Sequence, residues 1–326
     1  MSHHKSYRFQ EPGDESVLKL ETRPIPEPQA GEVRVRHTAI GVNFIDIYHR
    51  TGLYPLPLPS GLGLEAAGVV DAVGEGVTSC LPGDRVAYCG GPPGAYGETH
   101  VVAADKLLAL PDAVSDEQAA AALLKGLTAA YLLFETFAVR AGQTILWHAA
   151  AGGVGSIACQ WAKALGVRVI GTAGSDEKLE LARQNGCAEV IDYRQGNIAE
   201  RVRALTSGQG VPVVYDSVGR ATFEASLDCL SPRGLMVSFG NASGAVPDFS
   251  PLLLAQKGSL FLTRPTLGHY TSTREELESL ASRLFDAIGA GDIRVPVNQR
   301  YSLDQAAQAH RDLAQRKTTG SSILIP

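Results

Sequence analysis

The chain has 326 residues, of which 44% are hydrophobic, and a formal net charge of −5. This length allows two domains with substantial cores, while the acidic balance and the lack of basic runs argue against a nucleic-acid surface. The sequence contains no signal peptide pattern and no apolar run of the roughly 20 residues that cross a bilayer, and its five scattered cysteines indicate a reduced cytoplasmic protein.

The first 125 residues read as short strands separated by glycine and proline. Residues 32–39 alternate in polarity, as a half-buried strand does, and residues 66–73 and 84–88 are further candidates. The tract 54–61 contains three prolines, which exclude a helix or a central strand, so we expect a loop there.

Helical spacing follows over residues 115–138, with a predicted break at Lys125–Gly126. An α/β segment then runs from about 143 to 265. Its predicted strands lie near residues 145–148, 167–172, 189–191, 213–215, 235–239 and 259–263.

A glycine turn between the first two of these strands is the most informative motif. Residues 145–148 are apolar, a small-residue turn runs to Gly155, and residues 156–166 have helical spacing. Strand, glycine turn, helix and strand form the context of a dinucleotide fingerprint, whose helix N-terminus binds phosphates. We assign Ala151, Gly152, Gly153 and Val154 to the pyrophosphate. An ordinary turn without a ligand is the alternative, because Ala150 replaces the first glycine of the usual pattern.

The end of the second strand indicates which nucleotide binds. An NAD site places a carboxylate there, whereas residues 172–175 contain none and Lys178 follows one helical turn later. This favours NADPH over NADH. Asp176 and Glu177 are the counter-evidence, and we interpret them as the acidic first turn of the next helix.

Two later strands end in small or polar residues. Ligands of a doubly wound sheet lie at the carboxyl ends of its strands, so we expect Ser217 and the segment Phe239, Gly240 and Asn241 to face the cofactor. His148 precedes the glycine turn on a buried strand, where a hydrogen-bonded core histidine is the better interpretation.

The last part of the chain holds a helix over about 273–290, with Leu277, Leu280, Leu284 and Ile288 on one side. The apolar segment 322–326 should pair into the sheet of the N-terminal domain, which makes that domain discontinuous. The strand 259–263 is apolar for a sheet edge, so we expect a homodimer that covers it.

Several blocks in this order carry a family resemblance: 41–46, 60–68, 124–128, 148–155, 214–219, 237–241 and 263–265. Together they resemble the zeta-crystallin-like NADPH:quinone oxidoreductases of the medium-chain dehydrogenase/reductase superfamily. The resemblance implies an α/β fold, with a Rossmann doubly wound parallel sheet domain (126–265) inserted into a GroES-like, mainly-β catalytic domain (1–125 plus 266–326).

The zinc ligands of the superfamily's alcohol dehydrogenases are missing. Asn43 stands where those enzymes have a cysteine, and Leu64 stands where they have a histidine. Because zinc needs several thiolate, imidazole or carboxylate ligands, we predict no metal and interpret the remaining Glu65 as a structural carboxylate.

The expected reaction is NADPH-dependent reduction of a quinone. A quinone accepts a hydride readily and needs positioning and donors for its developing oxyanion. The candidate catalytic residues are Asn43, Tyr48, Tyr54 and Arg264. Packing of either tyrosine, or a turn role for Asn43, is the alternative in each case.

The resemblance also implies further contacts with the cofactor. Asp46 would hold a ribose or order Tyr48, while Lys178 and Tyr193 would bind the 2′-phosphate and the adenosine. Arg316 would reach the nicotinamide half, although with Arg311 and Lys317 it could equally form a solvated face. The remaining residues of the expected set are Thr128, Tyr131, Gly174, Ser175, Ser243 and Thr266.

Three functions stay open at this level. The first is quinone reduction, by hydride or by single electrons. The second is reduction of an enone or another alkene, in which Tyr48 would supply the proton. The third is a non-catalytic NADPH-binding protein with a structural or RNA-binding role, against which the acidic charge counts.

Overall fold

The computed structural model describes residues 2–326, and the chain divides into two compact units. The first unit comprises Met1–Leu127, Thr271–Gly289 and Val295–Pro326, and the second comprises Thr128–Tyr270 with Ala290–Arg294. One unit is therefore inserted into the other, with chain boundaries close to residues 127 and 270.

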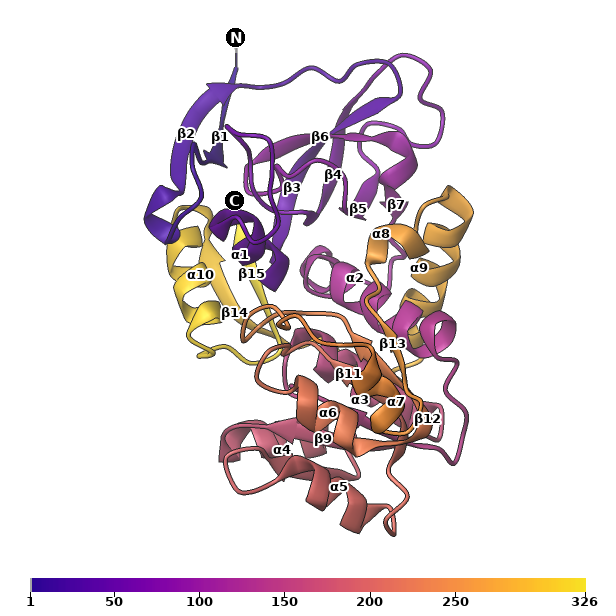
Figure 1. Ribbon diagram of the computed structural model, residues 1–326. Helices are drawn as coiled ribbons and strands as arrows, with labels where there is room; N and C mark the ends of the chain where they lie inside the picture. The colour runs from indigo at the N-terminus through magenta and orange to yellow at the C-terminus, as the bar shows by residue number, and fades with distance from the viewer. Residues whose placement is uncertain (1) are drawn as a thin grey trace. The chain divides into compact units, whose positions relative to one another are not determined.

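A seven-stranded sheet forms the frame of the first unit (Figure 1). Its strands, in spatial order, are β14 (Val297–Ser302), β15 (Ser321–Ile325), β3 (Glu32–Val42), β4 (Glu65–Val73), β5 (Arg85–Cys89) and β7 (Leu108–Ala109), with β6 (Thr99–Ala103) paired to β3. The apolar segment that ends the chain is thus β15, which pairs with β14 on one side and β3 on the other, as predicted.

The alternation of polar and apolar residues explains why residues 32–42 form the strand β3. Its first residues switch between partly exposed and fully buried side chains, and Val33 and Val35 lie in the core. The strands predicted at 66–73 and 84–88 are β4 and β5, and the proline-rich tract is a loop. The remaining elements of this unit are β1 (His3–Arg8), β2 (Lys19–Pro24), α1 (Phe44–Thr51), α9 (Arg274–Gly289), α10 (Ala306–Ala314) and short turns of tighter helix at Glu15–Val17, Ala104–Lys106 and Leu303–Gln305.

The helix α2 (Asp116–Ala130) corrects one prediction. It runs through Lys125 and Gly126 without the predicted break and continues as a wider turn over Tyr131–Thr136. A Cβ on Gly126 would lie 2.5 Å from Leu284 of α9, so the glycine admits a close-packed neighbour and does not end the helix. The glycine was taken for a helix break because the residue that requires it, Leu284, is remote in sequence.

The second unit is built on a six-stranded sheet in which every neighbouring pair is parallel. Its order is β10 (Glu189–Asp192), β9 (Arg168–Ala173), β8 (Thr144–Trp147), β11 (Val211–Asp216), β12 (Leu230–Ser238) and β13 (Phe261–Thr263). The helices are α3 (Gly153–Ala164), α4 (Asp176–Gln184), α5 (Ile198–Leu205), α6 (Phe223–Cys229), α7 (Leu252–Gln256) and α8 (Leu267–Tyr270). This is the predicted Rossmann-type parallel sheet.

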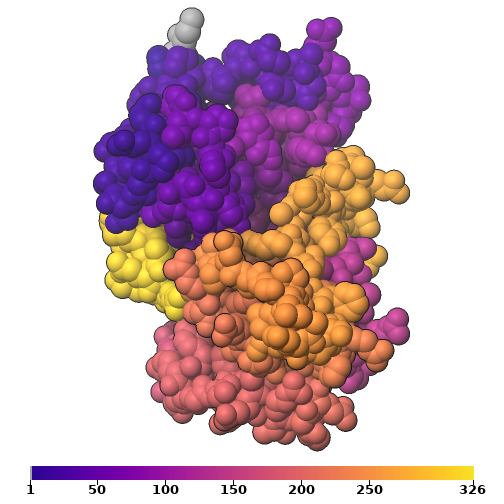
Figure 2. Space-filling model, in the orientation of Figure 1, coloured from indigo at the N-terminus to yellow at the C-terminus, as the bar shows by residue number. Residues whose placement is uncertain are grey.

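The edge strand β13 is shorter than the predicted 259–263. Ser259 has a φ of +56°, so extended structure begins only at Phe261. The side chains of Phe261 and Leu252 are both 61% exposed, in the orange segment that forms much of the visible face of this unit (Figure 2).

One helical stretch, Asp116–Thr136, has the length and composition of a membrane span. Within its most apolar window, 78% of the residues are buried inside the protein. A core helix passes the same test, so this stretch is weak evidence for a membrane segment.

Candidate active site

The glycine turn of the second unit leads from β8 into α3. Gly152 is the N-cap of α3, is exposed, and provides no side-chain cap for the first turn. A Cβ on Gly155 would lie 2.4 Å from the Ala149 carbonyl oxygen, so only glycine lets α3 start this close to the strand. An uncapped helix start of backbone N–H groups fits the pyrophosphate of a dinucleotide.

The end of β9 is the predicted adenosine side. Ser175 caps α4 by accepting a hydrogen bond from Lys178 N at 3.3 Å, and Lys178 lies in the first turn of α4. Tyr193 is 40% exposed, and its ring packs so close to Gly174 that a Cβ there would meet the hydroxyl at 2.0 Å. These four residues lie together at this end of the sheet.

Two of the acidic groups beside this region are paired. The Arg194 side chain donates to both Asp192 oxygens and holds the pKa of that carboxyl at about 2. Its Nη2 also lies 3.2 Å from Asp176, one of the two residues that counted against NADPH. Arg194 therefore pairs with Asp192 and Asp176, while Glu177, the other residue that counted against NADPH, is exposed in the first turn of α4.

The loop after β11 is shaped by a buried aspartate. Asp216 accepts from the N–H groups of Val218 and Gly219 at 2.7 and 3.0 Å, and from the hydroxyls of Thr222 and Ser226 at 2.6 and 2.8 Å. This network fixes the loop that begins at Ser217.

His148 belongs to the same network. Its Nε2 lies 3.0 Å from Ser226 Oγ, and its Nδ1 lies 3.0 Å from Thr172 Oγ1. Burial lowers its pKa, so the ring is a neutral core histidine, as predicted.

The segment after β12 lies against the same loop. A Cβ on Gly240 would lie 2.5 Å from the Ser217 carbonyl oxygen, so the two predicted cofactor segments meet. Phe239 packs on the indole of Trp147 at 5.7 Å, and Asn241 is partly exposed. Ser243 is different, because its Oγ donates to Val218 O and accepts from Ala221 N, which commits this hydroxyl to the loop.

Three other predicted residues of the second unit lie near its ends. Thr128 is buried, and Tyr131 stacks on Tyr270 with ring centroids 4.4 Å apart. Thr266 is exposed just before α8.

Arg264 follows β13 and donates from Nη1 to Ser238 O at 2.9 Å. It borders an open pocket of about 460 Å³ beyond the ends of β12 and β13. The other lining residues are Phe223, Ser238, Val246, Pro247, Asp248, Phe249 and Leu262.

The first unit contributes a side-chain cluster at the start of α1. Asn43 is the N-cap, is 4% exposed, and donates from Nδ2 to Glu65 Oε2 at 2.7 Å. Tyr48 and Tyr54 pack edge to face at 5.0 Å, and Tyr54 N donates to Tyr48 O. Three of the four predicted catalytic residues thus belong to one unit, at or shortly after α1, while Arg316, also of this unit, is exposed after α10.

Asp46 departs from one of its predicted roles. Its carboxyl is fully buried, and Oδ2 accepts from Asn43 N at 2.9 Å and from the Tyr96 hydroxyl at 3.0 Å. Burial raises its pKa to about 7, against the hydrogen bonds from Asn43 and Tyr96. A carboxyl placed this way anchors α1, and we do not retain the expectation that it binds a ribose.

Behind Asp46 lies a chain of donors that the sequence did not reveal. The Tyr96 hydroxyl donates its proton to Asp46, so His310 Nε2, 3.0 Å from the same hydroxyl, donates to the hydroxyl oxygen. The guanidinium of Arg50 lies 3.5 Å from the other ring nitrogen of His310, Nδ1. Burial, helped by the Arg50 charge, lowers the pKa of His310 to about 3.

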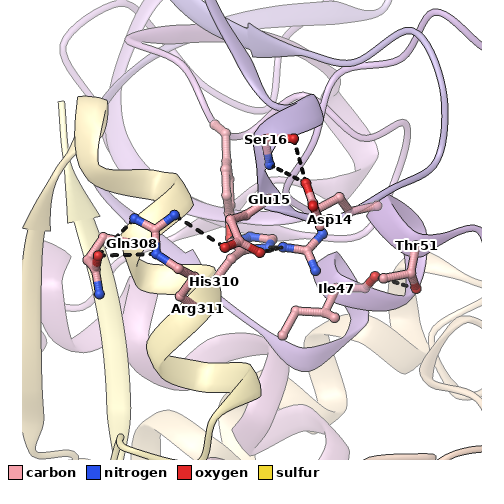
Figure 3. A network of polar contacts seen from close by, with 10 residues as sticks. Asp14, Glu15, Ser16, Ile47, Thr51, Gln308, His310 and Arg311 are labelled. Carbon is pink, nitrogen blue, oxygen red and sulfur yellow. Dashed lines mark hydrogen bonds and ion pairs between the residues drawn. The ribbon is translucent and has the colours of Figure 1, made fainter.

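The outer end of this chain is Glu15. It lies 3.7 Å from Arg50 and 3.2 Å from Arg311, and Figure 3 shows Glu15 facing Arg311 of α10. No periodicity could have found these partners, since Tyr96 and His310 are 214 residues apart in the chain.

Metal-ligating side chains do not gather here. Within residues 2–326, no three His, Cys, Asp or Glu side chains lie close enough together to hold an ion. Glu65, interpreted from the sequence as a structural carboxylate, accepts from Asn43 Nδ2 and Leu124 N and pairs with Lys125.

A glycine-turn Rossmann unit inserted into a β unit of this kind defines the class of two-domain, alcohol-dehydrogenase-like oxidoreductases. Residues 29–112 match the alcohol dehydrogenase GroES-like domain, and residues 153–286 match the zinc-binding dehydrogenase model. The chain belongs to the zeta-crystallin-like quinone oxidoreductase branch of the medium-chain dehydrogenase/reductase superfamily.

Relatives cover the full length of the chain. It is 58% identical to a quinone oxidoreductase of Pseudomonas aeruginosa, over 99% of both chains. It is 46% identical to a 2-haloacrylate reductase of a Burkholderia species, over 93% of both. The crystal structure of Escherichia coli quinone oxidoreductase complexed with NADPH superimposes with a TM-score of 0.97 at 51% identity, covering 99% of this chain and all of the other.

Proposed function

We propose that this protein is an NADPH-dependent quinone reductase that works without zinc. The observation that carries the proposal is the uncapped glycine start of α3, with Lys178 and no carboxylate at the end of β9, in a chain 58% identical to a quinone oxidoreductase. When bound, NADPH supplies a hydride to the electron-poor quinone ring.

The protein's own part is binding and orientation. The first-turn N–H groups of α3 hold the pyrophosphate, and Ser175, Lys178 and Tyr193 hold the phosphate-bearing ribose. Tyr48, Tyr54 and Arg264 are the proposed donors to the quinone oxygen on which negative charge develops, and Asn43, whose Nδ2 donates to Glu65, orients the reacting ligands. We further propose a cytoplasmic homodimer in which the edge strand β13, with the exposed Phe261, pairs with a second copy.

The test is oxidation of NADPH by the purified protein with 1,4-benzoquinone, and NADH serves as the control nucleotide. Turnover with NADPH preferred supports the proposal. Tight NADPH binding without turnover would instead favour a non-catalytic role.

A second candidate is alkene reduction, favoured by the 46% identity to a 2-haloacrylate reductase. That reaction must also protonate a carbon, for which Tyr48 is the candidate acid. Turnover of methyl vinyl ketone or 2-chloroacrylate with inert quinones would select this alternative, and Tyr48→Phe should then abolish it.

A further inference from the structure

The side chain of Asn43 is held from behind by a buried ion pair. Glu65, at the start of β4, is fully buried and accepts from Asn43 Nδ2 and from Leu124 N, each at 2.7 Å. Lys125 Nζ lies 3.5 Å from the same Glu65 oxygen, and its side chain is 7% exposed. All four residues belong to the first unit.

The fold makes room for this pair. A Cβ on Gly41 would lie 2.1 Å from Glu65 Oε2 and 2.4 Å from the Ala120 carbonyl oxygen. Any larger residue at this point of β3 would displace the carboxylate from Asn43. The backbone two residues before Asn43 is therefore shaped around Glu65.

Two polar atoms in this cluster lack a hydrogen-bond partner. Lys125 Nζ, although paired in charge with Glu65, and Asp46 Oδ1 are both buried without one among the described residues. Buried polar groups are normally satisfied, so an arrangement kept at this cost calls for an explanation beyond packing.

The chemistry of a carboxylate supplies that explanation. An ionised carboxylate only accepts hydrogen bonds, so the Asn43 carboxamide must turn its NH₂ group toward Glu65. A neutral amide or a protonated carboxyl could donate as well as accept, and the carboxamide could then flip. Lys125 places a positive charge 3.5 Å from this buried carboxylate, which offsets part of the cost of burying it.

We propose that Glu65 and Lys125 are positioning residues, which lock the Asn43 carboxamide in one orientation toward the reacting ligands. The proposal rests on the function proposed above, because it takes Asn43 as a group that touches the substrate or the nicotinamide. Asp46 complements the lock by holding the backbone of Asn43.

The decisive variant is the double replacement E65L/K125M. Exchanging a buried ion pair for apolar side chains of similar volume is often neutral or stabilising, so this variant should fold. We expect its kcat with benzoquinone to fall on the order of 100-fold, the loss typical of a misplaced catalytic group, while its KM for NADPH changes little.

A single replacement and its conservative counterpart separate positioning from packing. In K125M the Glu65 carboxylate loses the cation paired with it, so kcat should fall while the KM for NADPH changes little. K125R should restore most of the wild-type rate. The control is R85M, which breaks the Arg85–Asp116 pair of the same unit without touching Asn43 and should leave kcat unchanged.

A readout without turnover separates this proposal from the function. The side-chain amide protons of Asn43, assigned in the ¹⁵N spectrum with N43D, should resist exchange in the wild type and lose that protection in E65L/K125M. A stable double variant with the wild-type kcat, or with the amide still protected, overturns the proposal. If the wild type reduces no quinone, the proposed function fails. The exchange of the Asn43 amide protons still shows whether Glu65 and Lys125 hold the carboxamide in one orientation.

Discussion

The two regions that hold candidate site residues, one in each unit, are built by opposite means. In the second unit, the start of α3 offers backbone N–H groups beside Gly152, which supplies no side-chain cap. In the first unit, the start of α1 is surrounded by side chains, since Asn43 and Asp46 are held by Glu65 and Tyr96. The nucleotide turn depends on the absence of side chains, and the Asn43 cluster depends on their exact pairing.

This difference explains what the sequence could reveal. A backbone-built turn leaves its signal in consecutive residues, because glycines must stand where β8 approaches α3, and the turn was therefore predicted in place. The alternation of β3 and the apolar run of β15 were equally local signals, and both strands were predicted.

The side-chain network has no such signal. Asp46, Tyr96 and His310 come from three distant parts of the chain, and each alone resembles an ordinary buried residue. Asp46 was therefore assigned to a ribose, and Gly126 was read as a helix break, when the partners that explain them were Tyr96 and Leu284. Contacts between remote residues decide such positions, and a single sequence does not contain them.

The largest effect is expected from Gly155→Val, which changes the glycine turn before α3. The added Cβ would meet the Ala149 carbonyl oxygen at 2.4 Å and push α3 away from the turn. We expect the affinity for NADPH to fall by more than about 100-fold, because the N–H groups that bind the phosphates would be displaced. Fluorescence titration with NADPH measures this affinity. Gly268→Ala, where a Cβ would meet nothing within 4 Å, is the control. Unchanged affinity in G155V would remove the turn from the cofactor site.

The buried histidines of the first unit should make the stability of the protein depend on pH. Burial lowers the pKa of His310 and His37 to about 3 and that of His100 to about 4. The unfolded chain takes up these protons near pH 6.5 and the folded chain does not, so stability falls as pH drops from 6.5 toward 4. Asp46, with its pKa raised to about 7, opposes this trend, because its contribution is lost as pH rises from about 4 to 7.

The pKa shifts of the three histidines together outweigh the opposing shift of Asp46, so the free energy of unfolding falls as the pH is lowered. Each net proton contributes about 1.4 kcal/mol per pH unit to the slope. His310→Gln should reduce the slope between pH 4 and 6 by about one proton, measured by urea unfolding. The exposed His269→Gln serves as the control, and an identical slope in H310Q would contradict the buried, neutral assignment.

The smallest expected effect sharpens the nucleotide assignment. Lys178→Ala should weaken NADPH binding about 10-fold, the size of one partly exposed charge-assisted contact, and leave NADH binding unchanged. Arg183→Ala changes a cation of the same helix that pairs with Glu180, and should alter neither affinity. Equal losses for both nucleotides in K178A would show that Lys178 does not read the 2′-phosphate.

The place of β15 has a consequence for how the protein is made. This strand lies between β14 and β3, and β3 ends at Val42 while β15 begins at Ser321. A ribosome adding about 5–20 residues per second needs tens of seconds to make the chain between them. Until β15 is made, residues 40–42 of β3 lack this partner, whereas all six strands of the second unit are synthesised before β15. The inserted unit can therefore fold before the first unit has received its C-terminal strands.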